Sequence, residues 1–238
     1  MSAPRFFVDG PVTAGATVTL RPDDAHHASH VLRMRGDAPI VVVAAGVAWD
    51  AVMAAADCKT AHILRPSPDG GGDIGIDVTV LQALIKGAKF DDVVEKRVEL
   101  GASRIIPMRC ERSEADASAH KIERWRRIAR AAAQQSRRNI VPAVDDVRSF
   151  AEALSAVGAP LLVASERAPK GSLAEALRAH AGSTALAIAV GPEGSFTDAE
   201  IAAAKDAGAV FVSLGPAILR TETAAAALLA AIASVRVW

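Results

Sequence analysis

The stretch ALAIAVGPEGSFTDAE, residues 185–200, carries the pattern that decides the fold. Its first six residues, 185–190, are all apolar and have the length of a buried strand. A Gly-Pro turn follows at 191–196, and Thr197-Asp-Ala-Glu200 has the spacing of a helix capping box. A buried strand, a turn and a helix in this order form the repeating unit of a parallel α/β sheet.

The same alternation extends through the C-terminal two thirds of the chain. Strands are expected near 76–84, 104–108, 161–164 and 209–214, and helices near 90–101 and 121–136, from Ser172 and from Thr221. Strands joined through helices run parallel, with helices on both faces of the sheet. The fold class predicted for residues 73–238 is therefore α/β with a parallel sheet.

Residues 5–64 have a different pattern, in which short apolar runs alternate with turns. The runs 18–20, 40–44 and 48–53 have strand character, and a helix is expected over Asp23–Met34. Pro66–Gly72 combines residue types that end both helices and strands. This segment predicts a linker between a small, mostly β, barrel-like domain at residues 1–70 and the α/β domain.

Composition excludes several classes of protein. The chain has 238 residues, 51% hydrophobic and 23% charged, as in ordinary globular proteins. No run reaches the roughly 18 apolar residues of a membrane span, and the N-terminus lacks a secretory pattern, so a cytoplasmic protein without a membrane partner is expected. Cys58 and Cys110 stand apart, which favours buried thiols. No metal site is expected, because His26, His27 and His30 have no further ligand at a recognised spacing.

A net charge of zero conceals a basic segment. Residues 86–148 hold 15 basic and 10 acidic side chains, and Lys121–Arg138 holds seven basic residues and a single acid, Glu123. At helical spacing one face of this segment is apolar, formed by Ile122, Trp125, Ile128, Ala129 and Ala132. The arginines lie broadly on the other side. We interpret them as contacts for RNA phosphates, with a plain solvated face as the alternative.

Three turns rich in glycine and proline follow the last strands: Ala164–Pro169, Gly191–Phe196 and Leu214–Glu222. Ligands of parallel sheets bind at the carboxyl ends of the strands, where such turns present free backbone N–H and C=O groups. We therefore expect the three turns to form one site for a flat, polar cofactor. None of them contains a dinucleotide or P-loop fingerprint, which argues against a dinucleotide or ATP.

The second and third turns carry motifs of a known family. GPEGSF at 191–196, followed by LGPAILRTETA at 214–224, resembles the C-terminal signature of the RsmE family, SPOUT-class methyltransferases that modify uridine N3 in 16S ribosomal RNA. The resemblance extends to HASHVLRMRG (27–36), KGAK (86–89), EKRVELG (95–101) and AQQSRRNIVP (133–142), and so covers nearly the whole chain. Ser195 departs from the family's usual glycine, and Ala217 from a frequent arginine.

The resemblance implies an RNA-binding PUA-like β-barrel at residues 1–70 and a SPOUT domain with a trefoil knot at 73–238. It implies S-adenosylmethionine as cofactor, 16S ribosomal RNA of the small subunit as substrate, and a homodimer. The apolar helix Thr223–Val235 suits the dimer contact or an ordinary core. The expected cofactor-binding residues are Ala164, Ser165, Glu166, Val190, Gly191, Pro192, Glu193, Gly194, Leu214, Gly215, Ile218, Leu219, Arg220 and Thr223. The expected RNA contacts are Arg33, Arg35, Lys86, Lys89, Arg112, Arg126, Arg130, Arg137, Arg138 and Asn139.

Methyl transfer to N3 requires a base or a cation, because N3 is a poor nucleophile while it carries its proton. Arg220 is the candidate catalytic residue, since a guanidinium near O2 or O4 favours the N3 anion. The structural alternative is an ion pair of Arg220 with Glu193 or Glu222. For Glu193 itself two roles are considered, accepting a proton and ordering its turn by accepting backbone N–H bonds, and we favour the ordering role. Two other functions stay open: a SPOUT-type enzyme for ribose 2′-OH or another base, and a non-catalytic RNA-binding protein.

Overall fold

The computed structural model describes residues 3–86 and 89–236 and divides the chain into two units. The first consists of Met1–Gly72 with Ala133–Ile140, and the second of Asp73–Ala132 with Val141–Trp238. Ala133–Ile140, which we expected in the α/β domain, thus groups with the N-terminal unit. Gly87 and Ala88 of the KGAK motif lie outside the described residues.

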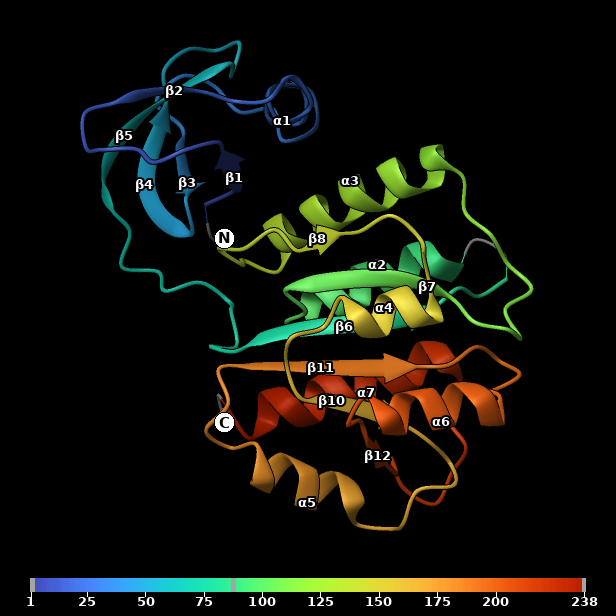
Figure 1. Ribbon diagram of the computed structural model, residues 1–238. Helices are drawn as coiled ribbons and strands as arrows, with labels where there is room; N and C mark the ends of the chain where they lie inside the picture. Colours follow the sequence, from blue (N-terminus) through green and yellow to red (C-terminus); the bar gives the residue numbers. More distant parts are fainter. Residues whose placement is uncertain (1–2, 87–88, 237–238) are drawn as a thin grey trace. The chain divides into compact units, whose positions relative to one another are not determined.

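The first unit is built on a curled five-stranded sheet (Figure 1). Its strand order is β1-β3-β4-β5-β2, with β1 parallel to β3 and the other neighbours antiparallel. Alternate strand residues such as Phe6, Val42 and Ile63 fill its core. The elements are β1 (Arg5–Val8), β2 (Thr17–Thr19), α1 (Pro22–His26), β3 (Pro39–Ala44), β4 (Val47–Met53) and β5 (Thr60–Pro66).

The helix predicted over Asp23–Met34 is shorter and irregular. α1 continues as a π-helical turn, His27–Val31, and the chain leaves it at Arg33 with a φ of 52°. The Ser29 hydroxyl donates to the carbonyl of Ala25 at 2.8 Å, a side-chain bond that competes with regular helical pairing.

Arg5 ties three segments of the first unit together. Its side chain is 2% exposed, and Nη1 donates to the Arg137 carbonyl at 2.6 Å and to Oδ1 of Asn139. Nη2 donates to Oδ2 of Asp69 at 3.0 Å, and Asn139 Nδ2 donates to the carbonyl of Gly70. One buried guanidinium therefore joins β1, the predicted linker and residues 137–139, which explains why Ala133–Ile140 groups with this unit.

The second unit contains a seven-stranded parallel sheet among its described residues. The order is β12-β10-β11-β6-β7-β8, and β9 also pairs with β7. The predicted α/β class with a parallel sheet is confirmed. The strands are β6 (Asp77–Ala83), β7 (Arg104–Arg109), β8 (Ala143–Val144), β9 (Arg148–Ser149), β10 (Leu161–Ala164), β11 (Ala185–Val190) and β12 (Val210–Val212). The helices are α2 (Lys89–Glu99), α3 (Ala119–Gln135), α4 (Phe150–Ser155), α5 (Ser172–Ala179), α6 (Asp198–Asp206) and α7 (Thr221–Ser234).

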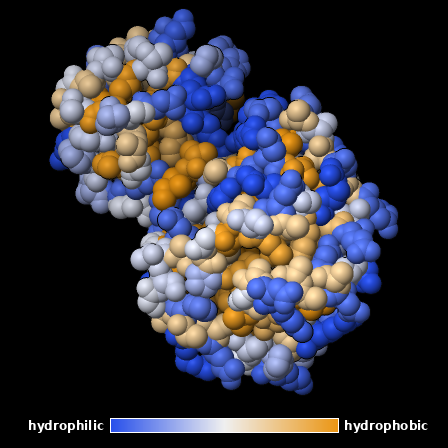
Figure 2. Space-filling model, viewed as in Figure 1, coloured by the Kyte–Doolittle hydropathy of each residue, from blue (hydrophilic) through white to orange (hydrophobic). Residues whose placement is uncertain are grey.

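Helices cover both faces of this sheet (Figure 1). Leu81 and Ala83 of β6 belong to the core that α4 and α6 cover, whereas Gln82 between them bonds Arg97 of α2. α7 packs on β6, β10 and β11 and against α2. Apolar residues also reach the surface over α4 and α6 (Figure 2), where Leu154 and Ile201 are only partly buried.

The basic helix α3 buries the face that its spacing predicts. Ile122, Trp125, Ala129 and Ala132 are buried and Ile128 is half-buried. β8, β9 and α4 were not predicted, because two to six residues are too few for a periodic pattern. In the part of the chain that the structure describes, no helix combines the length and apolarity needed to cross a bilayer.

The Arg5 contacts lead to a stability prediction. Arg5→Met is expected to lower the free energy of unfolding of the first unit by about 3 kcal/mol, because Asp69 and buried carbonyls lose their partner. Arg65→Met is the matched control: Arg65 also forms a 3.0 Å ion pair, with Asp50, but its side chain is 73% exposed. It should cost less than about 1 kcal/mol. Hydrogen exchange of β3 and β4 amides in rising urea measures both values, and equal costs would contradict the assigned role of burial.

Candidate functional site

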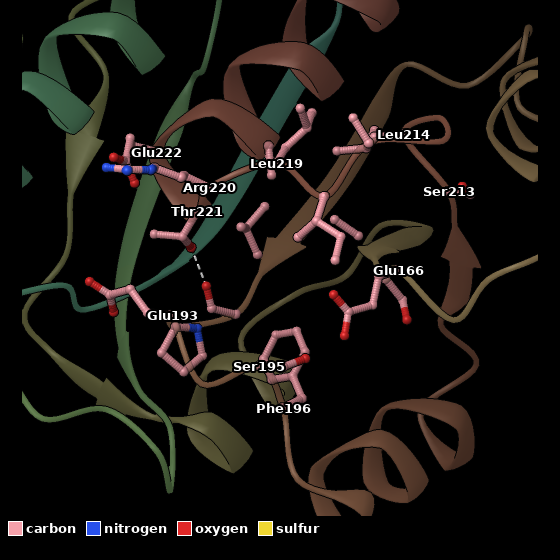
Figure 3. A pocket seen from close by; sticks show the side chains of 18 of the residues that line it. Glu166, Glu193, Ser195, Phe196, Ser213, Leu214, Leu219, Arg220, Thr221 and Glu222 are labelled. Carbon is pink, nitrogen blue, oxygen red and sulfur yellow. Dashed lines mark hydrogen bonds between the residues drawn. The ribbon is translucent and has the colours of Figure 1, made fainter.

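The three predicted turns meet at one edge of the parallel sheet. They follow β10, β11 and β12, which are adjacent strands in the order β12-β10-β11, so their carboxyl ends lie side by side. Together the turns line an open pocket of about 470 Å³ (Figure 3). Lys89, at the start of α2, lines it too.

Most of the predicted cofactor-binding residues line this pocket. They are Ala164, Ser165, Glu166, Val190, Gly191, Pro192, Glu193, Leu214, Gly215, Ile218, Leu219 and Arg220. Gly194 and Thr223 do not: the Gly194 carbonyl accepts a bond from Arg112 Nη1 at 2.8 Å, and Thr223 is exposed on the first turn of α7. Sequence reasoning did not assign Ser195, Phe196, Ser213, Pro216, Ala217, Thr221, Glu222 or Ala224 as cofactor-binding residues, although all of them line the pocket.

Thr221 joins the third turn to the second. Its hydroxyl donates to the carbonyl of Gly191, and its side chain is buried (Figure 3). Threonine at the start of a helix is commonly the N-cap residue. Here the N-cap is Arg220, so the Thr221 hydroxyl is not used for capping and bonds Gly191 instead. No local pattern in the sequence could have indicated this long-range bond.

Glu200, rather than Glu193, accepts backbone hydrogen bonds where the second turn ends. The Glu200 carboxylate accepts from the backbone N–H of Thr197 and of Glu111, both at 2.9 Å. Glu193 is exposed at the pocket (Figure 3), and within the described residues no backbone N–H of its turn donates to it. The predicted ordering role of Glu193 is therefore wrong; within the turn the backbone N–H of Ser195 donates to the carbonyl of Pro192 instead.

Ser195 adopts a backbone conformation that glycine prefers. Its φ is 60°, in the left-handed region where a side chain is strained. Phe196 then packs into the core, and its ring lies so close to Gly191 that a Cβ there would come within 3.2 Å. A glycine at position 195 would adopt this conformation without strain, whereas serine is accommodated at a cost in strain.

Charged side chains gather at one end of the pocket. Arg220 and Glu222 point to the same end in Figure 3, away from Glu166, and Lys89 Nζ lies 3.9 Å from Glu222 Oε1. Within the described residues no carboxylate oxygen lies within 4.0 Å of the Arg220 guanidinium. The expected alternative, an ion pair of Arg220 with Glu193 or Glu222, is therefore not observed.

The predicted RNA contacts differ in exposure. Arg33, Arg35, Lys86, Lys89, Arg112 and Arg137 are exposed, and Arg126, Arg130 and Asn139 are half-buried. Arg126 is also held by Glu123 and by Asp146. Arg138 is 1% exposed, because the chain turns at Arg137 with a φ of 62° and directs the next side chain inward. The Arg138 side chain is therefore not accessible to an RNA in this structure, and the prediction that it contacts RNA is not supported.

Cys110 is the first residue of the loop after β7. This loop contains Arg112, and its Glu111 N–H donates to the Glu200 carboxylate. Burial, together with the charge of Glu200, raises the pKa of the Cys110 thiol to about 12. Burial also raises the pKa of Cys58, and neither cysteine forms a disulfide. Among residues 3–86 and 89–236 no cluster of three His, Cys, Asp or Glu side chains could hold a metal ion.

This environment predicts an unreactive thiol. At about pH 8 roughly one Cys110 in 10⁴ is a thiolate, so iodoacetamide should alkylate it at least about 1,000-fold more slowly than an exposed cysteine. Denaturation in guanidinium should remove the protection. Mass spectrometry of labelled peptides measures both rates, and fast labelling of Cys110 in the folded protein would contradict its placement.

Comparisons with known proteins agree with this geometry. A family model described as an RNA methyltransferase domain matches residues 73–233. The ribosomal RNA small subunit methyltransferase E of Mycobacterium bovis is 34% identical, over 98% of this chain and 92% of its own length. That of Bacillus subtilis is 32% identical, over 96% and 95%. The crystal structure of the Neisseria gonorrhoeae enzyme bound to S-adenosylmethionine is 34% identical, covers 98% of this chain and 96% of that one, and has a TM-score of 0.85. The chain belongs to the RsmE family, the ribosomal RNA small subunit methyltransferases E.

Proposed function

We propose that the protein is an S-adenosylmethionine-dependent methyltransferase that acts on N3 of a uridine in 16S ribosomal RNA of the small subunit. The observation that carries the proposal is the convergence of three post-strand turns on one pocket in a chain of the RsmE family. The pocket volume falls in the range of small-molecule sites. The Neisseria gonorrhoeae relative was crystallised with S-adenosylmethionine.

The lining residues fit a folded nucleoside. Gly191 and Gly215 expose backbone groups for hydrogen bonds to the edges of a base, and Leu214, Ile218 and Leu219 offer apolar surface for its faces. Ile218 is 81% exposed, which is unusual for an isoleucine unless a ligand covers it. When bound, the cofactor supplies an electrophilic methyl group on sulfur.

Arg220 is the proposed catalytic residue. It lines the pocket, and no carboxylate of the described residues pairs with it. A guanidinium at a carbonyl oxygen of uracil stabilises the negative charge that develops when N3 loses its proton. The turns contribute by holding the two reactants at attack distance.

We assign the wider architecture by the same family. Residues 1–70 are proposed as a PUA-like RNA-binding barrel, and 73–238 as a SPOUT domain with a trefoil knot. The path of the chain supports the knot: it leaves the edge strand β12, reaches α7 on the middle of the sheet, and is tied to Gly191 through Thr221. We also propose a homodimer through the α7 region that acts on the small subunit in the cytoplasm.

Methylation of small subunits that lack the modification tests the function. With labelled cofactor, nucleoside mass spectrometry is expected to detect 3-methyluridine. Arg220→Ala should lower turnover about 100-fold or more while cofactor affinity stays within about twofold. A 2′-O-methyl nucleoside or another methylated base would overturn the assignment of N3. Absence of cofactor binding at millimolar concentration would instead indicate a non-catalytic RNA-binding protein.

Thr221 provides a test of the cofactor site. Thr221→Val removes the bond to Gly191 with little change in volume, so the Kd for S-adenosylmethionine should rise about five- to tenfold. Thr221→Ser keeps the hydroxyl and should bind within about twofold of the natural protein. Isothermal titration calorimetry measures the three affinities. If valine binds as well as threonine, the contact between the turns does not shape the cofactor site.

A further inference from the structure

Two cations from different elements reach the same end of the pocket. Arg220 comes from the turn before α7, and Lys89 from the start of α2, 131 residues earlier in the chain. Glu222, in the first turn of α7 and two residues after Arg220, has its Oε1 3.9 Å from Lys89 Nζ. Lys89 was expected to contact RNA phosphates, but the structure shows that it lines the pocket, next to Glu222.

The neighbouring Lys86 has a different environment. It pairs with Glu114 and does not line the pocket. The hydrogen bond that Lys86 donates to Glu114 raises the pKa of Lys86, and the charge of Glu193 adds to the effect. The two lysines of the KGAK motif therefore have different environments, and Lys89 is the one that lines the pocket with Arg220.

A buried arginine holds the elements that carry these cations. Arg97 of α2 is 0% exposed, and its Nη2 donates to the Glu222 carbonyl at 2.9 Å and to Gln82 Oε1 at 3.1 Å. Because Lys89 and Arg97 share one helix, this contact fixes Lys89 relative to the first turn of α7. Burial lowers the pKa of Arg97 to about 10, so it still carries a charge at neutral pH.

The chemistry of uracil calls for two cations. N3 lies between two carbonyl groups, and loss of its proton spreads the negative charge over N3, O2 and O4. A cation at each oxygen stabilises that anion from both sides and leaves the N3 lone pair open to the methyl group. A carboxylate in the plane at N3 would instead block the attack.

We propose that Lys89 is a second catalytic cation, which binds the uracil carbonyl oxygen that Arg220 does not, and that Glu222 positions it. This inference rests on the proposed function. The N3 proton leaves to solvent water, and its bonding pair stays on the ring. That pair forms the bond from N3 to the methyl carbon as the carbon–sulfur bond breaks, with the electrons of that bond going to sulfur.

Other charges around Lys89 leave this end of the pocket positive. Glu222 and Glu193 are the carboxylates that face it from α7 and from the turn after β11, and Arg220 and Arg97 oppose them. On α2 itself Asp91 is already paired, with Arg124 and with the indole N–H of Trp125. Removal of Lys89 therefore destabilises the N3 anion. Loss of the N3 proton should then need a higher pH, and the methylation rate should follow it.

The pH dependence of single-turnover methylation in Lys89→Met tests the proposal. With the full-length protein and small subunits, the rate should fall about 30- to 100-fold at pH 7 and recover partly towards pH 9.5, with the midpoint of the profile raised by about one unit or more. Lys89→Arg keeps the positive charge, so its pH profile should have the natural midpoint and its rate should stay within about fivefold of the natural rate. Lys96→Met removes the same charge from an exposed position on the same helix, and it should change neither the rate nor the midpoint of the pH profile.

Three outcomes would overturn this role of Lys89. A higher KM for the small subunit with an unchanged pH profile would make Lys89 a phosphate contact. A weaker Kd for S-adenosylmethionine in Lys89→Met would make it a ligand of the cofactor. An unchanged rate would remove it from the mechanism. If the natural protein itself makes no 3-methyluridine, the proposed function fails first, and that result is distinguishable because it does not depend on any variant.

Discussion

The parallel alignment of β12, β10 and β11 is the constraint on which the site depends. Adjacent parallel strands end at the same edge of the sheet, so the turns after them converge. They do so although the first turn begins at Ala164 and the third ends 58 positions later, at Glu222. Each turn alone is an ordinary strand-to-helix connection. Only their adjacency produces a pocket, and the bond from Thr221 to Gly191 keeps two of them in contact.

Buried polar groups then determine how the turns are held. Glu200 satisfies backbone N–H groups from two loops, and Arg97 satisfies the first turn of α7. Such groups are costly to bury. Both oxygens of the Glu200 carboxylate accept hydrogen bonds, whereas in Arg97 only Nη2 donates, and its buried Nε and Nη1 have no hydrogen-bond partner among the described residues. Their contribution is geometric: they fix where the backbone of the pocket lies, while the exposed Arg220 and Lys89 remain available for a ligand.

Local patterns in the sequence were sufficient for the α/β class, the strand and helix positions around the three turns, and the expectation that the turns form one site; the individual pocket residues came from the family resemblance. They failed where a contact joins residues far apart. Nothing near Arg138 predicts that it is buried, because its position depends on the turn at Arg137 and on the bond from Arg5, 133 residues away, to its carbonyl. Likewise, a capping box predicts Glu200 as a local cap but does not indicate its second acceptor role for Glu111. Long-range hydrogen bonds have no periodic signal in sequence.

The discontinuous first unit limits how the protein can be divided. Its chain leaves at Gly72 and returns at Ala133–Ile140, so the polypeptide crosses between the two units three times. A fragment that stops at the glycine-rich segment would lack the carbonyls and the asparagine amide that receive the Arg5 guanidinium. The two halves of such a protein are consequently poor candidates for separate inheritance, and recombination during evolution would have to move both pieces together.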